Sequence, residues 1–392
     1  MTNDTTLRQR FFQLLNGNHS GRILFFPDIT DWYKARRTAP GEVQQFEPGQ
    51  IIYDDDPFHQ HNHDMPERFL DWTLLDFYRN FGWGCPIHLY EWRDLNADGY
   101  ERTIHVEGRR ETTDISTPVG AIRQIRTLAA DGSYCITEHF AKTASDLDVI
   151  RWATQHTTIQ VRHDRIQKAL DALKNFGVID IPIGRSPFGT FIHNAMGLFN
   201  GIYALQDEKQ KVERFLDGMR EPFLETIKAA ASTDARIVII SDHADEHLIA
   251  PPYYEKYCIP IYQEACEILH QAGKIVSTHV DGNIHALLPL FAQTGFDLLD
   301  GCTPAPMSNY NVQQLSDALS DQLFAYCGIP SSLFMTNRPD QEIRGWAEKI
   351  KQQSNGRMIL NVGDILSPEG DIHQVIKVGQ YIQQCDMTDG MG

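Results

Sequence analysis

Residues Lys274–Asp300 read KIVSTHVDGNIHALLPLFAQTGFDLLD and contain the unit from which the fold can be predicted. The stretch begins with a short β-branched run, passes through a turn at Asp281-Gly282 and continues into a segment with helical periodicity over Ile284–Gln293. A second apolar run ends it at Phe296–Asp300. A strand, a helix and a strand in this order are typical of the βα units that build a parallel sheet.

The same unit recurs through the chain, and eight short apolar runs can be counted. They are Ile23–Pro27, Pro86–Trp92, Val178–Ile183, Arg236–Ser241, Lys274–Val280, Phe296–Asp300, Leu323–Cys327 and Met358–Val362. Eight strand–helix units are the number that closes a (β/α)8 barrel. We therefore predict the α/β class and a (β/α)8 TIM barrel. No composition shift marks a linker, so one domain over residues 1–392 is expected.

Two segments depart from the βα period. Residues 39–68 are rich in Pro, Asp, His and aromatic residues, and an irregular stretch of this length predicts a functional loop or lid. It contains the tract His59–Asp64 (HQHNHD), which no strand fixes and which therefore favours a solvated or lid loop over a metal site. Residues 100–137 alternate like antiparallel strands, with Asp131-Gly132 as a hairpin turn signal, and predict a β insertion.

The composition excludes some classes of function. Thirty-five Lys and Arg residues against 52 Asp and Glu give a formal charge of −17, which repels nucleic-acid phosphates and anionic membrane surfaces. We therefore expect no nucleic-acid partner and no membrane partner. The seven cysteines include no CxxC pair, and no apolar stretch approaches the ~18 residues of a membrane span. Free thiols and a cytoplasmic location are expected.

Ionisable side chains follow the apolar runs where the strands should end. In barrels of this kind the carboxyl ends of the strands converge on one face, where the chemistry takes place. The residues delivered there are Asp28, Glu91, Arg185, Ser186, Asp242, His243, Asp245, Glu246, His279, Asp281, Cys302, Cys327 and Asp364. These residue types include both metal ligands and general acids or bases. The sequence therefore predicts a metal or acid–base site at the barrel mouth.

Several of these residues also have a structural alternative. Asp364 could cap a helix, and Cys302 and Cys327 could be packing residues. His279 differs, because it ends an apolar strand and is followed within two residues by Asp281 and then a glycine. A structural histidine requires no such neighbours, which favours a functional role for His279.

Five motifs follow one another between about Gly177 and Leu366. They are Ser186-Pro187-Phe188, Ile240–Glu246 (ISDHADE), Ala250–Tyr257 (APPYYEKY) with Pro260, His279–Gly282 (HVDG) and Leu360–Asp364 (LNVGD). In this order they resemble the uroporphyrinogen decarboxylase superfamily. The resemblance covers about half of the chain and implies a (β/α)8 barrel, in agreement with the eight runs, and a homodimer.

The true decarboxylases of this superfamily match the chain poorly at two places. They carry an arginine-bearing stretch at the first strand, where Phe25–Tyr33 reads FFPDITDWY with two acids and no arginine. A porphyrinogen with many carboxylates should meet guanidinium groups, not groups of its own charge. The histidine that those enzymes carry after the last strand is replaced here by Asp364. Decarboxylation of uroporphyrinogen is therefore disfavoured.

The metal-dependent methyltransferases that work with corrinoid proteins form the other branch, which the chain resembles more. Members of that branch bind zinc through a His-x-Cys after strand five and a Cys after strand eight. This chain keeps the histidine as His279 but has Asp281 and Asp364 at the two cysteine positions. Histidine with carboxylates gives a harder, more Lewis-acidic ion than thiolates do, suited to polarising an ether or hydroxyl oxygen.

A second ligand spacing in the same branch leads to a different set of ligands. Zinc methyltransferases that demethylate methoxylated aromatic compounds are associated with a Glu-x14-Glu-x20-His spacing. The same offsets in this chain fall on His243, Cys258 and His279. All three are residue types that bind zinc, although Cys258 lies in a predicted helix where core packing is the alternative.

The resemblance and the residues together give the main functional hypothesis, a zinc-dependent methyltransferase. Zinc or another divalent metal would be held by His279 and Asp281 with one or more of His243, Cys258 and Asp364. It would bind a small methoxy-type substrate, and a corrinoid on a partner protein would accept the methyl group in a demethylation reaction. In this hypothesis the catalytic acids are Asp242, Glu246 and Asp28, and Asp242 or Glu246 protonates the leaving group.

Two further hypotheses remain open from the sequence. The first is a metal-independent decarboxylase that acts on a smaller substrate, with Asp28 or Asp242 stabilising a protonated intermediate. The second is a barrel retained as a binding module, in which the acids cap helices and His279 is structural. The cluster of acids at predicted strand ends argues against a binding module.

Overall fold

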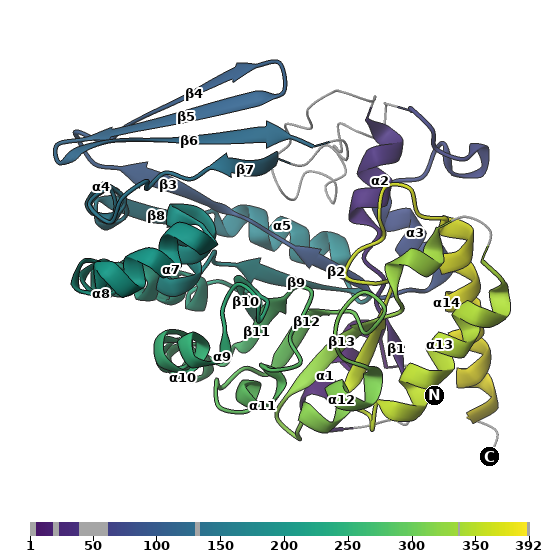
Figure 1. The fold of residues 1–392 in the computed structure, drawn as a ribbon. Helices are drawn as coiled ribbons and strands as arrows, with labels where there is room; N and C mark the ends of the chain where they lie inside the picture. Colours follow the sequence, from purple (N-terminus) through teal and green to yellow (C-terminus); the bar gives the residue numbers. More distant parts are fainter. Residues whose placement is uncertain (1–4, 19–22, 39–61, 130–133, 336–337, 390–392) are drawn as a thin grey trace.

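Eight parallel strands form one curled sheet at the centre of the computed structural model, which describes residues 5–18, 23–38, 62–129, 134–335 and 338–389 (Figure 1). The strands are β1 (Leu24–Phe25), β2 (Cys85–His88), β9 (Gly177–Pro182), β10 (Ile237–Ala244), β11 (Ile275–Val280), β12 (Leu298–Cys302), β13 (Phe324–Gly328) and β14 (Met358–Asn361). Their order is β1-β14-β13-β12-β11-β10-β9-β2. Each strand overlaps one of the eight predicted runs, so the predicted α/β barrel is confirmed.

The sheet closes between β1 and β2. Gly84, immediately before β2, donates a backbone hydrogen bond of 3.0 Å to the carbonyl of Phe25 in β1. A Cβ atom at position 84 would lie 2.3 Å from the ring of Phe26. The two segments can therefore approach closely enough for this hydrogen bond because residue 84 is a glycine.

An apolar layer fills the amino end of the barrel interior. Strand side chains in this layer pack against the amino-terminal helix α1 (Leu7–Leu15), whose Phe11 ring lies 5.1 Å from that of Phe26. The strand residues of the layer are Leu24, Phe26, Val178, Ile237, Leu298, Phe324, Tyr326 and Ile359. Thr6 and Gln9 form a capping box that fixes the start of α1. The helix thus seals one end of the barrel and leaves the carboxyl ends of the strands for a site.

Helices surround the sheet and connect its strands (Figure 1). The longer ones are α2 (Thr30–Arg37), α3 (Leu74–Phe81), α4 (Leu147–Gln155), α5 (His163–Leu173), α7 (Leu198–Asp207), α8 (Lys209–Ala231), α10 (Ile259–Gln271), α12 (Val312–Ala318), α13 (Asp340–Gln353) and α14 (Ile372–Asp389). Shorter helical segments are η2 (Glu67–Phe69), α6 (Pro187–Gly189), η3 (Thr190–Met196), α9 (Pro251–Tyr253), η4 (Tyr254–Cys258), α11 (Leu288–Phe291) and η5 (Ser331–Phe334). None of the helices among the described residues combines the length and apolar composition that crossing a membrane requires.

One predicted helix is much shorter in the structure. The periodicity indicated a helix over Ile284–Gln293, but α11 spans only Leu288–Phe291. Pro289 lies in its first turn, and proline fits a helix best at this position because it has no backbone N–H to donate. The segment from Ile284 to Leu287 therefore forms the end of the loop that follows β11.

An antiparallel sheet stands beside the barrel in the region where the β insertion was predicted. Its strands are β4 (Glu101–Glu107), β5 (Arg110–Thr117), β6 (Gly120–Leu128) and β7 (Tyr134–Glu138), paired in sequence order. A two-stranded sheet of β3 (Trp92–Asn96) and β8 (Thr157–Val161) flanks it in the sequence. The predicted Asp131-Gly132 turn and residues 39–61 of the predicted loop lie outside the described residues.

We expect Gly84→Ala to destabilise the protein by about 1–3 kcal/mol, because the added methyl group would push the Phe26 ring away from the β1–β2 junction. The free energy of unfolding in urea measures this effect. Gly345→Ala is the matched control, because Gly345 lies in α13 and its Cβ would meet open space. This control should leave stability unchanged or raise it by up to ~1 kcal/mol. Equal effects of the two substitutions would contradict the packing argument.

Candidate functional site

Polar side chains face the barrel interior one step above the apolar layer. Side chains alternate along a strand, so a residue two positions after a member of the apolar layer points to the same side. Asp180 follows Val178 in this way, Asp300 follows Leu298, and Asn361 follows Ile359. The strand period therefore places ionisable groups inside the barrel at its carboxyl end.

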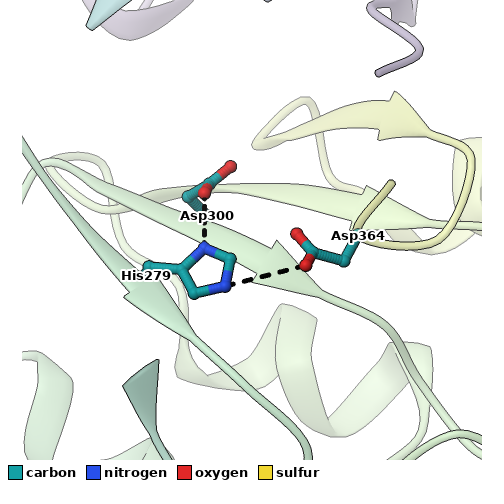
Figure 2. Close-up of side chains that lie close together, drawn as sticks. All are labelled: His279, Asp300 and Asp364. Atoms are coloured by element: carbon teal, nitrogen blue, oxygen red, sulfur yellow. Dashed lines mark hydrogen bonds and ion pairs between the residues drawn. The ribbon is translucent and has the colours of Figure 1, made fainter. Parts of the chain in front are cut away.

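His279 lies between two carboxylates in this polar layer (Figure 2). Its Nδ1 atom is 2.7 Å from Oδ2 of Asp300, and its Nε2 atom is 3.7 Å from Oδ2 of Asp364. Asp300 is the register neighbour of His279 on the adjacent strand β12, whereas Asp364 follows β14. One ring nitrogen of His279 is thus hydrogen-bonded, and the other faces a second carboxylate across a wider gap.

Gly301 makes room for this arrangement. Its φ of +80° lies in the left-handed region that glycine adopts readily. A Cβ atom at position 301 would lie 2.4 Å from the carbonyl oxygen of Val280 and 2.8 Å from Cε1 of His279. Any side chain at this position would therefore displace the His279 ring from its place between the two aspartates.

A second histidine–aspartate pair occupies the neighbouring part of the barrel. His88 of β2 and Asp180 of β9 are register neighbours, and Nδ1 of His88 is 2.8 Å from Oδ1 of Asp180. The side chain of His88 is 35% exposed, and it lines a cavity at the barrel mouth. Both histidine–aspartate pairs therefore bridge adjacent parallel strands.

The pKa values in this layer reflect burial and mutual charge. Burial lowers the pKa of His279, but the hydrogen bond to Asp300 and the charges of Asp364 and Asp300 outweigh it and raise the pKa to about 9. Burial, together with repulsion from Asp300, raises the pKa of Asp364 to about 6 despite the charge of His279. Burial opposes ionisation of Asp300 too, but its hydrogen bond from His279 lowers its pKa. Without a metal, His279 is therefore an imidazolium held by ionised Asp300 near neutral pH.

A cavity of about 350 Å³ opens above these groups. It is lined by Asp28, Thr30, Asp31, Lys34, Ile87, His88, Tyr90, Pro182, Ile239, Ser241, His243, His279, Asp364 and Ile365. Its volume lies near the lower end of the ~300–1,000 Å³ range of small-molecule sites. The site thus accommodates a small substrate.

Asn361 connects two of the acids that line the cavity. Its side-chain oxygen accepts a hydrogen bond of 2.9 Å from the backbone N–H of Asp28, and its amide group donates one of 2.9 Å to the carbonyl of Asp364. The Asp28 carboxylate accepts hydrogen bonds from the backbone N–H and the hydroxyl of Thr30, at 2.8 and 2.6 Å. Burial raises the pKa of Asp28. Asp28 is therefore a fixed acid inside the cavity that can hold a proton.

His243 and Asp281 lie beside His279. The ring centroids of His243 and His279 are 4.6 Å apart, and Nδ1 of His243 is 3.7 Å from Oδ2 of Asp281. His243 has a φ of +50°, and the pairing of β10 with β11 shifts register between Ile240 and Ala244. Left-handed backbone at a residue with a side chain is strained and is common at functional sites. Of the predicted metal ligands, His279 and Asp364 thus lie in one cluster with Asp300, and His243 and Asp281 form a pair beside His279.

Asp242, a predicted catalytic acid, has a different environment. Its carboxylate is fully buried and accepts hydrogen bonds from the backbone N–H of Ser186, at 2.6 Å, and from the hydroxyls of Ser186 and Tyr262. A Cβ atom at Gly189 would lie 2.2 Å from its Oδ1 atom. Asp242 is not among the residues that line the cavity. Its contacts fix the segment after β9 and leave it away from a substrate in the cavity.

Glu246 and Cys258 also lie away from the cavity lining. Glu246 accepts hydrogen bonds from the backbone N–H of Ala286, at 2.6 Å, and from the side chain of Asn309, at 2.8 Å. It thereby joins the loops that follow β10, β11 and β12. Cys258 is fully buried in η4, and burial raises its thiol pKa well above the usual value. The Glu246 carboxylate is thus engaged between these loops, and the Cys258 thiol is enclosed in the core.

The sequence reasoning missed Asp300, His88 and Asp180 as members of the site. It considered residues that follow the strands, whereas these three lie within them. A signal was present, because each is an ionisable residue within a predicted strand run and Asp180 and Asp300 fall on the inward-facing period. The pairing of each histidine with one aspartate depends on strand register, which the sequence does not specify.

An eight-stranded parallel barrel with ionisable side chains at the carboxyl ends of its strands is an architecture on which many enzymes are built. The family model for uroporphyrinogen decarboxylase (URO-D) matches residues 138–384, more than half of the chain. The chain therefore belongs to the URO-D family. No curated protein matches its sequence.

Two solved structures are similar to the chain over most of its length. A methyltransferase from Methanosarcina mazei superposes with a TM-score of 0.62 at 12% identity, over 97% of this chain and 99% of that one. A B12-independent methionine synthase from Shewanella sp. W3-18-1 has a TM-score of 0.41 at 9% identity, over 94% of this chain and 98% of that one. The first similarity shows that the chain shares the overall fold of that structure.

The metal-free protein should lose stability as the pH rises above neutrality. Burial lowers the pKa of His88, but the charge and hydrogen bond of Asp180 raise it well above the usual value. Burial also raises the pKa of Asp180 despite the charge of His88, so both groups bind protons more tightly in the folded state. The contribution of His88 is complete below about pH 6.5 and is lost as the pH rises through its raised pKa.

The free energy of unfolding in urea, measured with EDTA between about pH 6 and pH 9, tests this expectation. The wild-type protein should lose more stability over this range than His88→Gln, which cannot take up the proton. A stability difference between the two proteins that stays constant with pH would contradict the assigned role of the pair.

Proposed function

We propose that the protein is a metal-dependent methyltransferase that binds zinc or another divalent ion at His279 and Asp364. The observation that carries the proposal is the arrangement around His279. Asp300 accepts the hydrogen bond from Nδ1, so Nε2 is left to face Asp364. A metal-binding histidine usually donates one ring N–H to a carboxylate or similar acceptor and binds the metal through its other ring nitrogen.

The donor atoms fit a small divalent ion. Zinc binds histidine nitrogen and carboxylate oxygen at about 2.0–2.2 Å, so two such ligands of one ion lie roughly 3–4 Å apart. The distance of 3.7 Å from Nε2 of His279 to Oδ2 of Asp364 falls in this range and exceeds that of a hydrogen bond. His279, Asp300 and Asp364 form the cluster of potential ligands found among the described residues. We assign Asp300 to orienting His279, because it already accepts the Nδ1 hydrogen bond.

His243 and Asp281 complete the proposed set. His243 lines the cavity, Asp281 lies beside His243, and their side chains are 38% and 67% exposed. They are therefore accessible to an ion or a substrate atom beside His279. Nitrogen and carboxylate ligands suit zinc, and also manganese or iron. Cys258 is left out of the set because it is buried away from the cavity.

A bound metal would supply Lewis acidity, drawing charge from the oxygen that departs as the methyl group leaves. The protein's own residues would orient the metal-binding histidine, fix the acids and supply the proton. Asp300 keeps the proton on Nδ1 of His279, and Asn361 fixes the backbone at Asp28 and Asp364. Asp28, inside the cavity and with a raised pKa, is better placed than Asp242 or Glu246 to protonate the leaving oxygen.

Further parts of the proposal rest on similarity. The Methanosarcina mazei structure is a methyltransferase and covers nearly the whole chain, which supports methyl transfer as the reaction class. The corrinoid protein as methyl acceptor and the methoxy-type donor follow from the resemblance to the corrinoid branch. We propose a homodimer on the same basis, and a cytoplasmic location on the basis of the cysteine pattern.

Elemental analysis of the purified protein tests the metal site. We expect about one zinc or other divalent ion per chain, lost in His279→Ala because the ion loses its nitrogen ligand. His270→Ala is the matched control, since His270 forms a similar pair with Asp297, at 2.9 Å, on the outer helix α10. Full metal content in His279→Ala would refute the assigned site.

Substitution of the orienting carboxylate gives a second test. Asp300→Asn should weaken zinc binding by about 10- to 100-fold, the usual cost of removing the group behind a metal-binding histidine. Competition with a chromogenic chelator measures the affinity. Unchanged affinity would show that Asp300 does not orient the ligand.

Methyl transfer itself can be assayed with cob(I)alamin and a set of methoxylated compounds. Loss of the Co(I) absorption should require the substrate, and it should stop after EDTA treatment and return with added zinc. Release of CO₂ from a carboxylated substrate at a rate that EDTA does not change would instead support the metal-independent decarboxylase.

A further inference from the structure

One ionisable pair at the cavity has no part in the proposed metal site. Nδ1 of His88 is 2.8 Å from Oδ1 of Asp180, the same kind of contact that joins His279 to Asp300. The side chain of Asp180 is 13% exposed, whereas that of His88 is 35% exposed and lines the cavity. The aspartate is therefore enclosed, and the histidine is open to a ligand.

The second ring nitrogen of His88 is available to that ligand. Asp180 occupies Nδ1, and Nε2 has no hydrogen-bond partner among the described residues. In the order of the sheet only β10 separates the two strands of this pair from the two strands that carry His279 and Asp300. His88 and His279 line the same cavity of about 350 Å³. A substrate that fills so small a cavity therefore contacts both histidines.

The surroundings of His88 keep its ring protonated near neutral pH. Burial lowers its pKa, but the charge and hydrogen bond of Asp180 raise it well above the usual value. The other ionisable groups that act on His88 from neighbouring elements are Asp300 of β12, Asp28 after β1, Asp364 after β14 and His279 of β11. The acids favour the protonated ring, and His279 opposes it. Asp180 has the largest favourable effect and is not a proposed metal ligand, so its effect persists when a metal is bound.

Asp28 is the other acid in the cavity that could supply a proton. Its carboxylate accepts two hydrogen bonds from Thr30, which favour the ionised form. The charge of His88 also lowers the pKa of Asp28 and partly offsets the effect of burial. A general acid must carry its proton before the reaction begins. The protonated ring of His88 meets this condition at neutral pH better than Asp28 does.

We propose that His88, positioned by Asp180, is the proton donor of this site and protonates the oxygen that leaves when the methyl group is transferred. As the C–O bond breaks, the oxygen keeps the electron pair and the methyl group passes to the Co(I) corrinoid. The oxygen takes the proton from Nε2 of His88, and the neutral ring regains a proton from water in the cavity. A histidine held at Nδ1 by a buried carboxylate is a recurrent acid–base arrangement. The inference rests on the proposed function for the identity of the atom that receives the proton.

Binding of a product analogue tests the donor without turnover and without metal. 4-Nitrophenol is titrated into EDTA-treated protein at about pH 7, and its affinity is compared with that of 4-nitroanisole, whose methyl group blocks the oxygen. The phenol should bind as the coloured phenolate and at least tenfold more tightly, because a charged donor then meets a charged acceptor. A phenol that binds no more tightly than the anisole would overturn the proposal.

Variants then assign this preference to His88. His88→Asn keeps an amide N–H for Asp180 but has no group at the position of Nε2, so it should lose the preference and still bind 4-nitroanisole. Asp180→Asn keeps the ring but removes its counter-charge, so the preference should disappear at a lower pH than in the wild type; this variant also serves if His88→Asn does not fold. His270→Ala, on the outer helix α10, is the control. An unchanged preference in both variants at every pH would overturn the proposal.

Turnover of substrates with different leaving groups separates a proton donor from a structural residue. With cob(I)alamin and zinc, His88→Asn should slow methyl transfer from methoxybenzene on the order of 100-fold or more. The loss should be much smaller for 4-nitroanisole, because its leaving oxygen is a weak base and needs no proton. A merely structural histidine would affect both substrates equally. Asp28→Asn is the comparison, and a dependence on the leaving group in this variant instead of His88→Asn would overturn the proposal.

The two proposals can fail separately. The zinc content of His88→Asn should equal that of the wild type. A preference for the phenolate that depends on His88, in a protein that takes up no metal, would refute the proposed metal site and leave the donor standing. A normal zinc content with a preference that does not depend on His88 would refute the donor and leave the metal site standing.

Discussion

Hydrogen bonds between histidine and aspartate on neighbouring strands allow this barrel to keep ionisable groups in its interior. A charge buried without a partner is very costly, and pairing reduces that cost. His279 with Asp300, and His88 with Asp180, each provide such a pair within one register step of the sheet. The apolar layer sealed by α1 lies directly beneath them. The polar site is thus built on a closed hydrophobic base, and Asp28, Asp31 and Asp364 line the cavity above it.

The backbone adopts a left-handed conformation at two positions beside the site. Gly301 has a left-handed backbone and no side chain, which lets the His279 ring lie between Asp300 and Asp364. His243 adopts left-handed backbone despite having a side chain. Such departures from local preference persist where the surrounding structure enforces them, and they are concentrated at functional sites. Here they lie in β12 and β10, the two strands on either side of β11, which carries His279.

The acids at the strand ends form two groups with different surroundings, and the residue type alone does not tell which acid belongs to which group. Asp28 and Asp364 line the cavity and have raised pKa values. Asp242 and Glu246 have their carboxylates occupied by hydrogen bonds that fix the loops around the mouth. This division changes which acid is placed to protonate a leaving group.

The sequence by itself determined the architecture and the centre of the site. Eight apolar runs, each at a strand in the structure, were visible because a buried parallel strand requires a short continuous apolar segment. His279 was visible because it interrupts such a pattern with a carboxylate close behind. Only the tertiary structure decided that Asp300 is hydrogen-bonded to His279 and that the carboxylate of Asp242 is buried and hydrogen-bonded away from the cavity. The reason is that strand register and the burial of a side chain depend on contacts between segments far apart in the chain.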